Sequence, residues 1–288
     1  MVDFNVVGEG VVQVGKCTNI DPKAQIIFSK PGKVVVGDYC VIGPGVKIIC
    51  AGGDVEIGDW STLHDNCLVL SGQYVSIGAH CWFGQNSIID GSGGLSVGKG
   101  VRVGMYSQIW SHVAAGEQIE GCTLIGERPV VIEDDVWLVG SCIVASGVTI
   151  GRQTVALIGS NITKSFESHA VIAGAPAAKK EKINFYKELS ADEKWQMLEA
   201  WLQAAKSELG LELTSESKEK IELRDQDGSR VIFVRRRTQV NDVQKDPQAT
   251  ICCLEDKTYN KTYTSVEKKV LKYLAGNKAR FYTRADVA

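Results

Sequence analysis

His112 is the residue of this chain whose type and position best suit proton-transfer chemistry. It opens a polar stretch, "SHVAAGEQIEGCTLIGERP", where an otherwise regular apolar pattern stops. An imidazole titrates near pH 6.5, close to the pH at which a general base is most useful. Long excursions from a regular scaffold also concentrate functional side chains. We therefore predict a general base at the root of a loop over residues 111–130; the alternative is a surface histidine without a role.

A metal centre is not expected. The other three histidines, His64, His80 and His169, are scattered and form no local pair. A zinc site needs at least three protein ligands that converge on one point. The nine cysteines contain no CxxC pair. They are expected to be reduced thiols, as in a cytosolic protein, rather than a disulfide framework.

The pattern around the loop is a repeat of six residues. Only 44% of the chain is hydrophobic, yet an apolar residue stands at all three sixth positions of seven successive segments. Six residues are too few for a helix hairpin and suit a short strand followed by a turn. Three units make one triangular coil, and coils stack at a spacing of about 4.8 Å. The segments are Val14-Ile20-Ile26, Val36-Ile42-Ile48, Ile57-Leu63-Val69, Ile77-Phe83-Ile89, Val97-Val103-Ile109, Ile132-Leu138-Val144 and Ile150-Ala156-Ile162.

A second, small inward position precedes many of these apolar residues. Four of the cysteines, Cys40, Cys67, Cys81 and Cys142, occupy it. A free cysteine behaves as a small hydrophobe, so these four are predicted to be core residues and not nucleophiles.

The spacing of the coils locates the interruption. Successive coils begin 22, 21, 20, 20, 35 and 18 residues apart, and every excess over 18 falls after the third repeat of a coil. The insertions should therefore share one corner of the prism. The fifth coil carries by far the largest insertion, and His112 stands at its start.

The repeat resembles that of the hexapeptide-repeat acyltransferases, whose fold is the left-handed parallel β-helix. The resemblance covers roughly residues 10–180. It implies a mainly β protein with about seven coils and an extruded loop, in a domain over residues 1–180. The remaining residues, 181–288, are expected to form a C-terminal α+β domain.

The resemblance also assigns roles around the loop. Sugar acetyltransferases of this family have a histidine at the start of the extruded loop and then a hexad like "PVVIGDDVWIG"; here "SH" is followed by "RPVVIEDDVWLVG". His112 is thereby implied to be the base for direct attack of a hydroxyl on an acyl thioester, with no acyl-enzyme. By the same resemblance, the Gly140 N–H stabilises the oxyanion, Trp137 lines the cleft and Asn86 contacts the acceptor.

A further match lies at the end of the repeat and implies coenzyme A. "LIGSNITK" and "AGAPAAKK" are similar to the family's "IGAGSVVTK" and "AGNPAK" stretches. Val139, Leu157 and Ala175 depart from the family pattern, so acyl length is open and acetyl is the default. The implied acetyl-CoA contacts are Gly159 and Ser160 through the backbone, Thr163 and Lys164 near the pantetheine, and Lys179 and Lys180 at the nucleotide phosphates.

The C-terminal residues follow other patterns. Ser190 and Glu193 have capping-box spacing before an apolar stripe, and Gly210 is positioned to end that helix. Asp227-Gly228 predicts a hairpin turn, "TICCLEDKTYNKTYT" another strand pair, and Thr264 with Glu267 the start of a final helix. We recognise no family for this part.

Composition limits the partners. With 32 basic and 34 acidic residues, the net charge of −2 gives no reason to expect nucleic acid. No apolar stretch approaches the roughly 20 residues of a membrane helix, and the N-terminus lacks a basic segment before an apolar run. We expect a cytoplasmic protein, and the family resemblance implies a homotrimer with active sites between subunits.

Three functions stay open on the sequence. The first is acetyl transfer from acetyl-CoA to a carbohydrate hydroxyl, in surface-polysaccharide synthesis. The second is N-acetylation of a nucleotide-linked amino sugar, which would depend less on His112. The third is a non-catalytic β-helix scaffold, which would bind no coenzyme A.

Overall fold

The computed structural model describes residues 4–240 and 246–283. Contacts within the chain divide it into two compact units, Met1–Tyr186 and Lys187–Ala288. Within the described residues, neither helix is long and apolar enough to cross a membrane.

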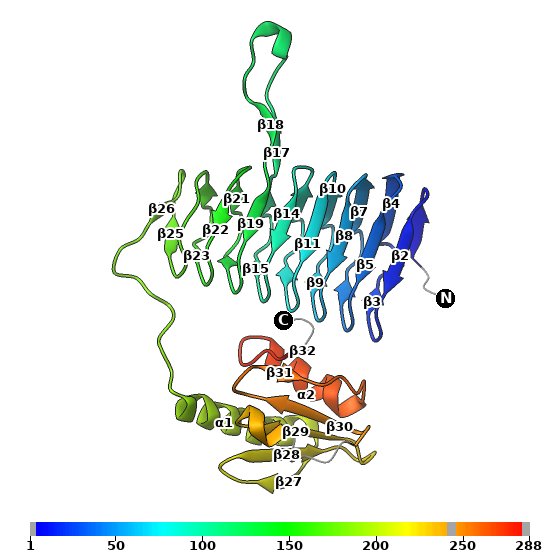
Figure 1. Ribbon diagram of the computed structural model, residues 1–288, viewed down its shortest axis with the longest axis vertical. Helices are drawn as coiled ribbons and strands as arrows, with labels where there is room; N and C mark the ends of the chain where they lie inside the picture. Colours follow the sequence, from blue (N-terminus) through cyan, green and yellow to red (C-terminus); the bar gives the residue numbers. More distant parts are fainter. Residues whose placement is uncertain (1–3, 241–245, 284–288) are drawn as a thin grey trace. The chain divides into compact units, whose positions relative to one another are not determined.

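The first unit is a left-handed parallel β-helix whose three sheets form the sides of a prism (Figure 1). Sheet A contains β1 (Asn5–Val7), β4 (Gln25–Lys30), β7 (Lys47–Ala51), β10 (Leu68–Ser71), β13 (Ile88–Gly91), β16 (Gln108–Ile109), β21 (Ile143–Val144) and β24 (Asn161–Ile162). Sheet B contains β2 (Val11–Val14), β5 (Lys33–Val36), β8 (Asp54–Ile57), β11 (Tyr74–Ile77), β14 (Leu95–Val97), β19 (Val130–Ile132) and β22 (Thr149–Ile150). Sheet C contains β3 (Asn19–Ile20), β6 (Val41–Ile42), β9 (Thr62–Leu63), β12 (Trp82–Phe83), β15 (Arg102–Val103), β20 (Trp137–Leu138), β23 (Val155–Ala156), β25 (Val171–Ala173) and β26 (Ala178–Lys179).

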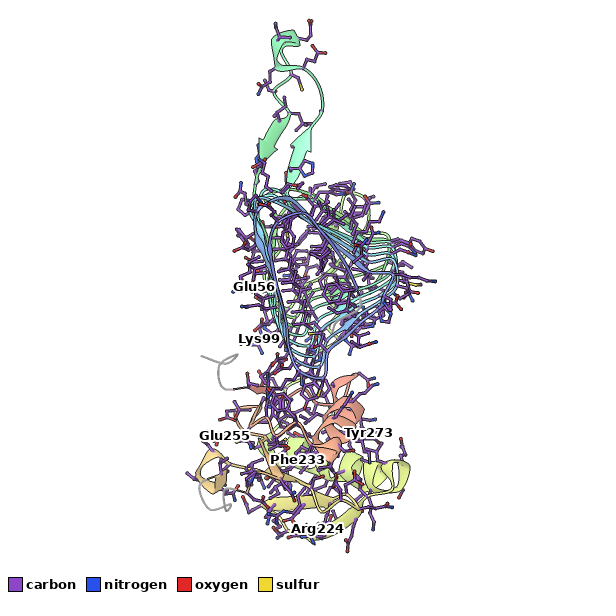
Figure 2. All side chains as sticks on the ribbon, turned by 90° about the vertical axis from the view of Figure 1, so that its right-hand side faces the viewer. Glu56, Lys99, Arg224, Phe233, Glu255 and Tyr273 are labelled. Atoms are coloured by element: carbon purple, nitrogen blue, oxygen red, sulfur yellow. The ribbon has the colours of Figure 1, made fainter. Side chains whose placement is uncertain are left out.

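The strand register confirms the six-residue repeat. Along sheet B, Ile57 pairs with Ile77 and Ile77 with Val97, which are starting residues of successive predicted coils. The middle and last positions of the repeat pair in the same way along sheets C and A. Each coil therefore runs through sheets B, C and A in turn. Figure 2 looks along the stack, where the sheets enclose a triangle filled with side chains.

The interior of the prism is made by the two predicted inward positions. The large apolar side chains of the repeat from coil two onward are at most 2% exposed except Val97, at 4%. Cys40, Cys67, Cys81 and Cys142 are buried beside them, as predicted. Burial raises the pKa of the Cys40 thiol to about 12 and that of Cys67 to about 11. A thiol that stays protonated is a poor nucleophile, which agrees with a packing role.

The insertions gather at one corner, where each coil passes from sheet A to sheet B; we call it the A–B corner. The corner between sheets C and A is called the C–A corner. At the fifth coil the A–B corner extends into an antiparallel hairpin of β17 (His112–Ala114) and β18 (Ile125–Glu127), with a 3-10 turn at Gln118–Glu120 (Figure 1). The expected polar loop is therefore a β-hairpin arm, and His112 begins its first strand.

The second unit is an α+β structure with one six-stranded sheet, in the order β27 (Glu212–Glu216), β28 (Lys220–Arg224), β29 (Arg230–Val234), β30 (Ala249–Cys253), β31 (Thr258–Tyr259) and β32 (Tyr282–Thr283). Helix α1 (Ala191–Leu209) begins with the predicted Ser190–Glu193 capping box and ends at Gly210. Helix α2 (Ser265–Ala275) is capped by Thr264, whose side chain accepts a hydrogen bond from the Glu267 N–H. A short 3-10 helix covers Arg237–Val240.

The coil register predicts opposite effects for two adjacent residues of β6. Ile42 points into the core and is 2% exposed, whereas Val41 points outward and is 42% exposed. Ile42→Asp would bury an unpaired carboxylate at a cost of several kcal/mol, so we expect insoluble protein. Val41→Asp should be soluble and should melt within about 2 °C of the wild type. Expression and thermal unfolding of both variants measure this, and a soluble Ile42→Asp with unchanged melting would show that the register is wrong.

Candidate active site

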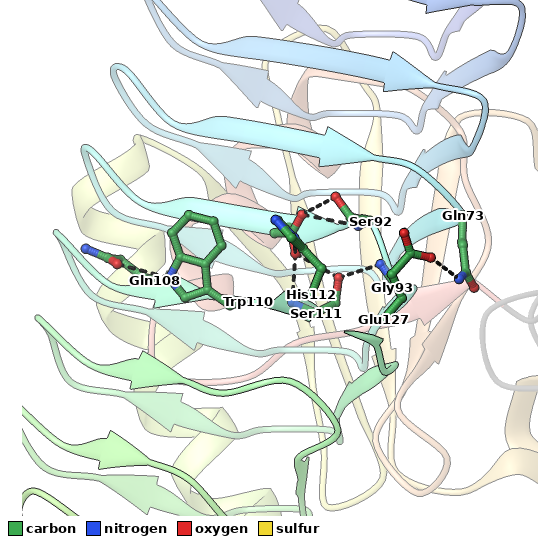
Figure 3. Close-up of polar contacts among 9 residues, drawn as sticks. Gln73, Ser92, Gly93, Gln108, Trp110, Ser111, His112 and Glu127 are labelled. Carbon is green, nitrogen blue, oxygen red and sulfur yellow. Dashed lines mark hydrogen bonds and ion pairs between the residues drawn. The ribbon is translucent and has the colours of Figure 1, made fainter. Parts of the chain in front are cut away.

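His112 is held by a carboxylate that the preceding coil supplies. Its Nδ1 lies 2.9 Å from Oδ2 of Asp90, at the end of β13 on the same A–B corner (Figure 3). The imidazole is 38% exposed and the Asp90 side chain 0%. One ring nitrogen is thus occupied inside the protein. The ring as a whole remains accessible from solvent.

Asp90 is surrounded by hydrogen-bond donors. Its Oδ2 accepts bonds from the N–H of Ser111 at 2.7 Å and from the Ser111 hydroxyl at 2.8 Å, besides His112. Its Oδ1 accepts bonds from the hydroxyl and N–H of Ser92, at 2.6 and 3.2 Å. Burial raises the pKa of Asp90, but the bonds from Ser92, His112 and Ser111 outweigh burial and hold the pKa below its ordinary value. Asp90 is therefore an ionised carboxylate at neutral pH.

The ionised carboxylate determines which nitrogen of His112 carries the proton. A carboxylate without a proton only accepts hydrogen bonds. His112 must therefore donate from Nδ1, and in the neutral ring the lone pair is left on Nε2. The geometry makes Nε2 the basic atom and fixes the plane of the ring, as a general base requires.

Two further contacts define the surroundings of the imidazole. The Trp110 ring lies 5.9 Å from the His112 ring, centroid to centroid, at 75°. On the hairpin, Glu127 is the cross-strand partner of His112, and its Oε2 accepts a bond from Gln73 Nε2 at 2.9 Å. This bond ties the base of the arm to the corner of the third coil (Figure 3).

Asp90 was not predicted from the sequence, although a signal for it exists. In each coil, the residue directly after the third repeat position lies in one outward column of sheet A. From the first coil to the seventh, this column contains Ile27, Ile49, Leu70, Asp90, Trp110, Ala145 and Thr163. Asp90 is the one acidic member of this column. It also precedes His112 by 22 residues, close to the length of one coil, so the two had to meet.

Four of the predicted site residues lie on the other corner of sheet A. Asn86, Gly140, Gly159 and Ser160 are in turns of the C–A corner, between strands of sheets C and A. Gly159 N–H donates to Gly140 O at 2.9 Å, so these two turns stack directly. Within the described part of the chain the Gly140 N–H meets no acceptor. Ser160 is buried, and both its N–H and its hydroxyl donate to Leu157 O.

The remaining predicted contacts lie elsewhere. Thr163 and Lys164 follow β24 on the A–B corner, two coils beyond His112. Lys179 on β26 forms an ion pair with Glu167. Lys180 is exposed, and no carboxylate among residues 4–240 and 246–283 pairs with it. Trp137 on sheet C is 45% exposed.

One chain thus does not bring the predicted site together. His112 and Asp90 stand on the A–B corner, and Gly140 and Gly159 on the C–A corner, with sheet A between them. No group of three or more His, Cys, Asp or Glu side chains that could hold a metal ion occurs in the described residues.

Comparisons with known proteins agree with this architecture. No family model matches the chain. Galactoside O-acetyltransferase of Lactococcus lactis is 27% identical over 164 residues, which are 57% of this chain and 70% of that protein. The putative colanic acid biosynthesis acetyltransferase WcaF of Escherichia coli is 30% identical over 49% of this chain and 65% of its own length. Nodulation protein L of Rhizobium meliloti is 35% identical over 124 residues, which are 42% of this chain and 67% of that protein.

The chain belongs to the hexapeptide-repeat acyltransferases. Among solved structures, the polySia-specific acetyltransferase NeuO matches 72% of this acyltransferase and 98% of its own chain, with a TM-score of 0.47 and 18% identity. The hexapeptide-repeat acetyltransferase VCA0836 of Vibrio cholerae, complexed with acetyl coenzyme A, matches 46% of this acyltransferase and 61% of its own chain, with a TM-score of 0.31 and 23% identity. Nodulation protein L thus confirms the predicted family, and the strand pairing of the chain itself confirms the predicted fold.

The acyltransferase should lose stability in acid partly through Asp90. Because the folded pKa of Asp90 is lowered, its stabilisation is complete above the ordinary aspartate value of about 3.9 and disappears as pH falls through the lowered pKa. Asp90→Asn should cost about 1–3 kcal/mol in the free energy of unfolding at neutral pH. The difference from wild type should shrink between about pH 5 and pH 2.

Denaturant unfolding at several pH values measures this difference. Asp54→Asn is the matched control, since exposed Asp54 accepts a single bond, from Lys33 N–H, near the same corner. A stability difference between the wild type and Asp90→Asn that stays constant across the acid range would contradict the assigned ionisation of Asp90.

Proposed function

We propose that this acyltransferase moves an acetyl group from acetyl-CoA to a hydroxyl of a carbohydrate, with Nε2 of His112 as general base. The observation that carries the proposal is the bond between His112 Nδ1 and buried Asp90 at 2.9 Å. A scaffold protein has no need of such a pair at the root of its one long insertion. The acceptor class is supported by the relatives that are named a galactoside O-acetyltransferase and a colanic acid biosynthesis acetyltransferase.

The proposed reaction is a direct transfer. The acceptor hydroxyl attacks the thioester carbonyl carbon while its proton passes to Nε2 of His112. Asp90 stabilises the imidazolium that forms, because its ionised carboxylate accepts the bond from Nδ1. Gly140 N–H, which has no acceptor in the described chain, donates to the tetrahedral oxyanion. The intermediate then expels the thiolate, which takes the proton back from Nε2.

Some of the predicted acetyl-CoA contacts are disfavoured because their hydrogen-bonding groups are already paired within the protein. The Gly159 N–H donates to Gly140 in the preceding coil and the Ser160 N–H donates to Leu157 in its own coil, which leaves the Gly159 carbonyl to accept a pantetheine amide. Ser160 is buried and serves the turn. Lys179 is paired with Glu167, so Lys180 and Lys164 are the better candidates for the nucleotide phosphates. Thr163 lies beside Lys164 on the corner that carries His112.

A homotrimer would complete the site and explain its division between two corners. The outward face of sheet A carries five large apolar side chains beside Gln25 and Lys47, namely Ile27, Ile49, Leu68, Leu70 and Ile88. On sheet B the outward positions include Lys33, Glu56, Ser76 and Ser96. If sheet A faces a three-fold axis, the A–B corner of each chain meets the C–A corner of the next. Asn86, Trp137 and Gly140 of one chain would then line a cleft with the neighbour's His112.

Removing the base should lower turnover without affecting the donor. We expect His112→Ala to lower kcat about 10²- to 10⁴-fold, the usual range for general-base help, while acetyl-CoA affinity stays within a few-fold of wild type. Thiol release from acetyl-CoA across a panel of sugars, amino sugars and nucleotide sugars measures both. Retention of more than half of the wild-type kcat by His112→Ala would refute the role of the base.

Mixed trimers test whether the site is shared between chains. His112→Ala removes the base, and Gly159→Tyr would block the C–A corner, where acetyl-CoA is proposed to bind. A tyrosine is compatible with this turn, because Tyr106 holds the equivalent position of the fifth coil with a φ of +60°. Each variant alone should be inactive. When the two variants are co-expressed at equal levels, His112 of a Gly159→Tyr chain meets an unblocked C–A corner of a His112→Ala chain in about one quarter of the sites. About a quarter of wild-type activity should therefore return.

The same preparations measure assembly. Sedimentation should give three times the chain mass of 31.2 kDa. No recovery of activity in the mixed sample, or a sedimentation mass near 31.2 kDa at micromolar concentration, would show that the site is not shared between chains.

A further inference from the structure

Trp110 is fixed beside the imidazole by its own contacts. Its indole Nε1 donates to Oε1 of Gln108 at 3.0 Å, and its ring stands nearly perpendicular to that of His112. Its backbone N–H donates to Val144 O in the next coil at 3.0 Å. Trp110 is half-buried, so part of this large apolar side chain remains accessible. It lies beside the imidazole of His112 (Figure 3).

The surface around this indole changes along sheet A. In the outward column of Trp110, the first three coils present the large aliphatic side chains of Ile27, Ile49 and Leu70, and the fourth coil presents the buried Asp90. The later coils present Ala145 and Thr163, which are small. The indole is therefore the last bulky member of the column before the coils to which the acetyl donor is assigned.

We propose that Trp110 is the platform on which a pyranose ring of the acceptor stacks, so that the ring's hydroxyl is directed at Nε2 of His112. The inference rests on the proposed acetyl transfer to a carbohydrate and names the part of the acceptor that is recognised. The C–H groups on one side of a pyranose carry partial positive charge and meet the electron-rich face of an indole favourably. Since Gln108 occupies the only polar atom of the indole, Trp110 recognises the sugar through its ring face and leaves the sugar hydroxyls to other groups.

The alternative is that Trp110 only supports His112. The two roles differ in which acceptors they affect. A platform contributes only when the acceptor has a ring to stack, whereas a support for His112 would affect every acceptor to the same extent.

The test compares a pyranoside with glycerol, an acyclic polyol, as acceptors for the full-length enzyme. For Trp110→Ala we expect kcat/KM for the pyranoside to fall about 10- to 100-fold, mainly through KM. With glycerol, kcat/KM should change less than about three-fold, and the shape of its pH profile should stay the same. Trp110→Phe keeps an aromatic face and should recover most of the pyranoside activity. Val41→Ala, a truncation of an exposed outward side chain on sheet C, is the control, and sedimentation of each variant checks assembly.

Each outcome decides the proposal. A selective loss with the pyranoside that Trp110→Phe restores would support it. An equal loss with both acceptors would overturn it and assign Trp110 to the support of His112. Unchanged pyranoside kinetics in Trp110→Ala would overturn it while leaving the proposed function intact. Failure of the wild-type enzyme to acetylate any carbohydrate would overturn both.

Discussion

The hydrogen-bonded register between successive coils is the constraint on which the rest of this molecule depends. Every coil places its three strands directly on those of the coil before, so residue spacing along the chain becomes position on a face or corner. An insertion at one corner leaves the other two in register. This is how the fifth coil can extend a hairpin at the A–B corner while Val97 still pairs with Ile132 across the interruption. The rigid stack below the hairpin keeps His112 in place.

The same register creates the polar centre. Ile89 and Ile109 pair in sheet A, and the residues that follow them bring Asp90 beneath Ser111 and His112. A buried carboxylate without partners would be costly, but here five donated hydrogen bonds stabilise the ionised form. The consequence for chemistry is specific: the proton of His112 is held on Nδ1, and its basic lone pair is directed away from the prism.

The sequence predicted the coils, the insertion corner and the position of His112 at the start of the insertion because these follow from local spacing. It predicted both helices of the second unit from their caps at Ser190 and Thr264, which are also local signals. It did not predict Asp90, because "DGSGG" after a strand has the composition of an ordinary turn and its partner lies 22 residues away. The parallel pairing of β29 with β30 was missed for a similar reason, since it joins segments that a long connection separates.

Asp90 holds His112 in the form that is protonated on Nδ1 and basic on Nε2. The most direct measurement is the ¹⁵N NMR spectrum of histidine-labelled protein above the titration range of imidazole, with His112→Ala to assign the signals. The structure predicts a neutral His112 ring with its proton on Nδ1 and an unprotonated Nε2, and Asp90→Asn should disturb this signal selectively. A His112 ring protonated on Nε2 with Nδ1 free would refute this role of Asp90, because the bond to Asp90 would then lack its donor.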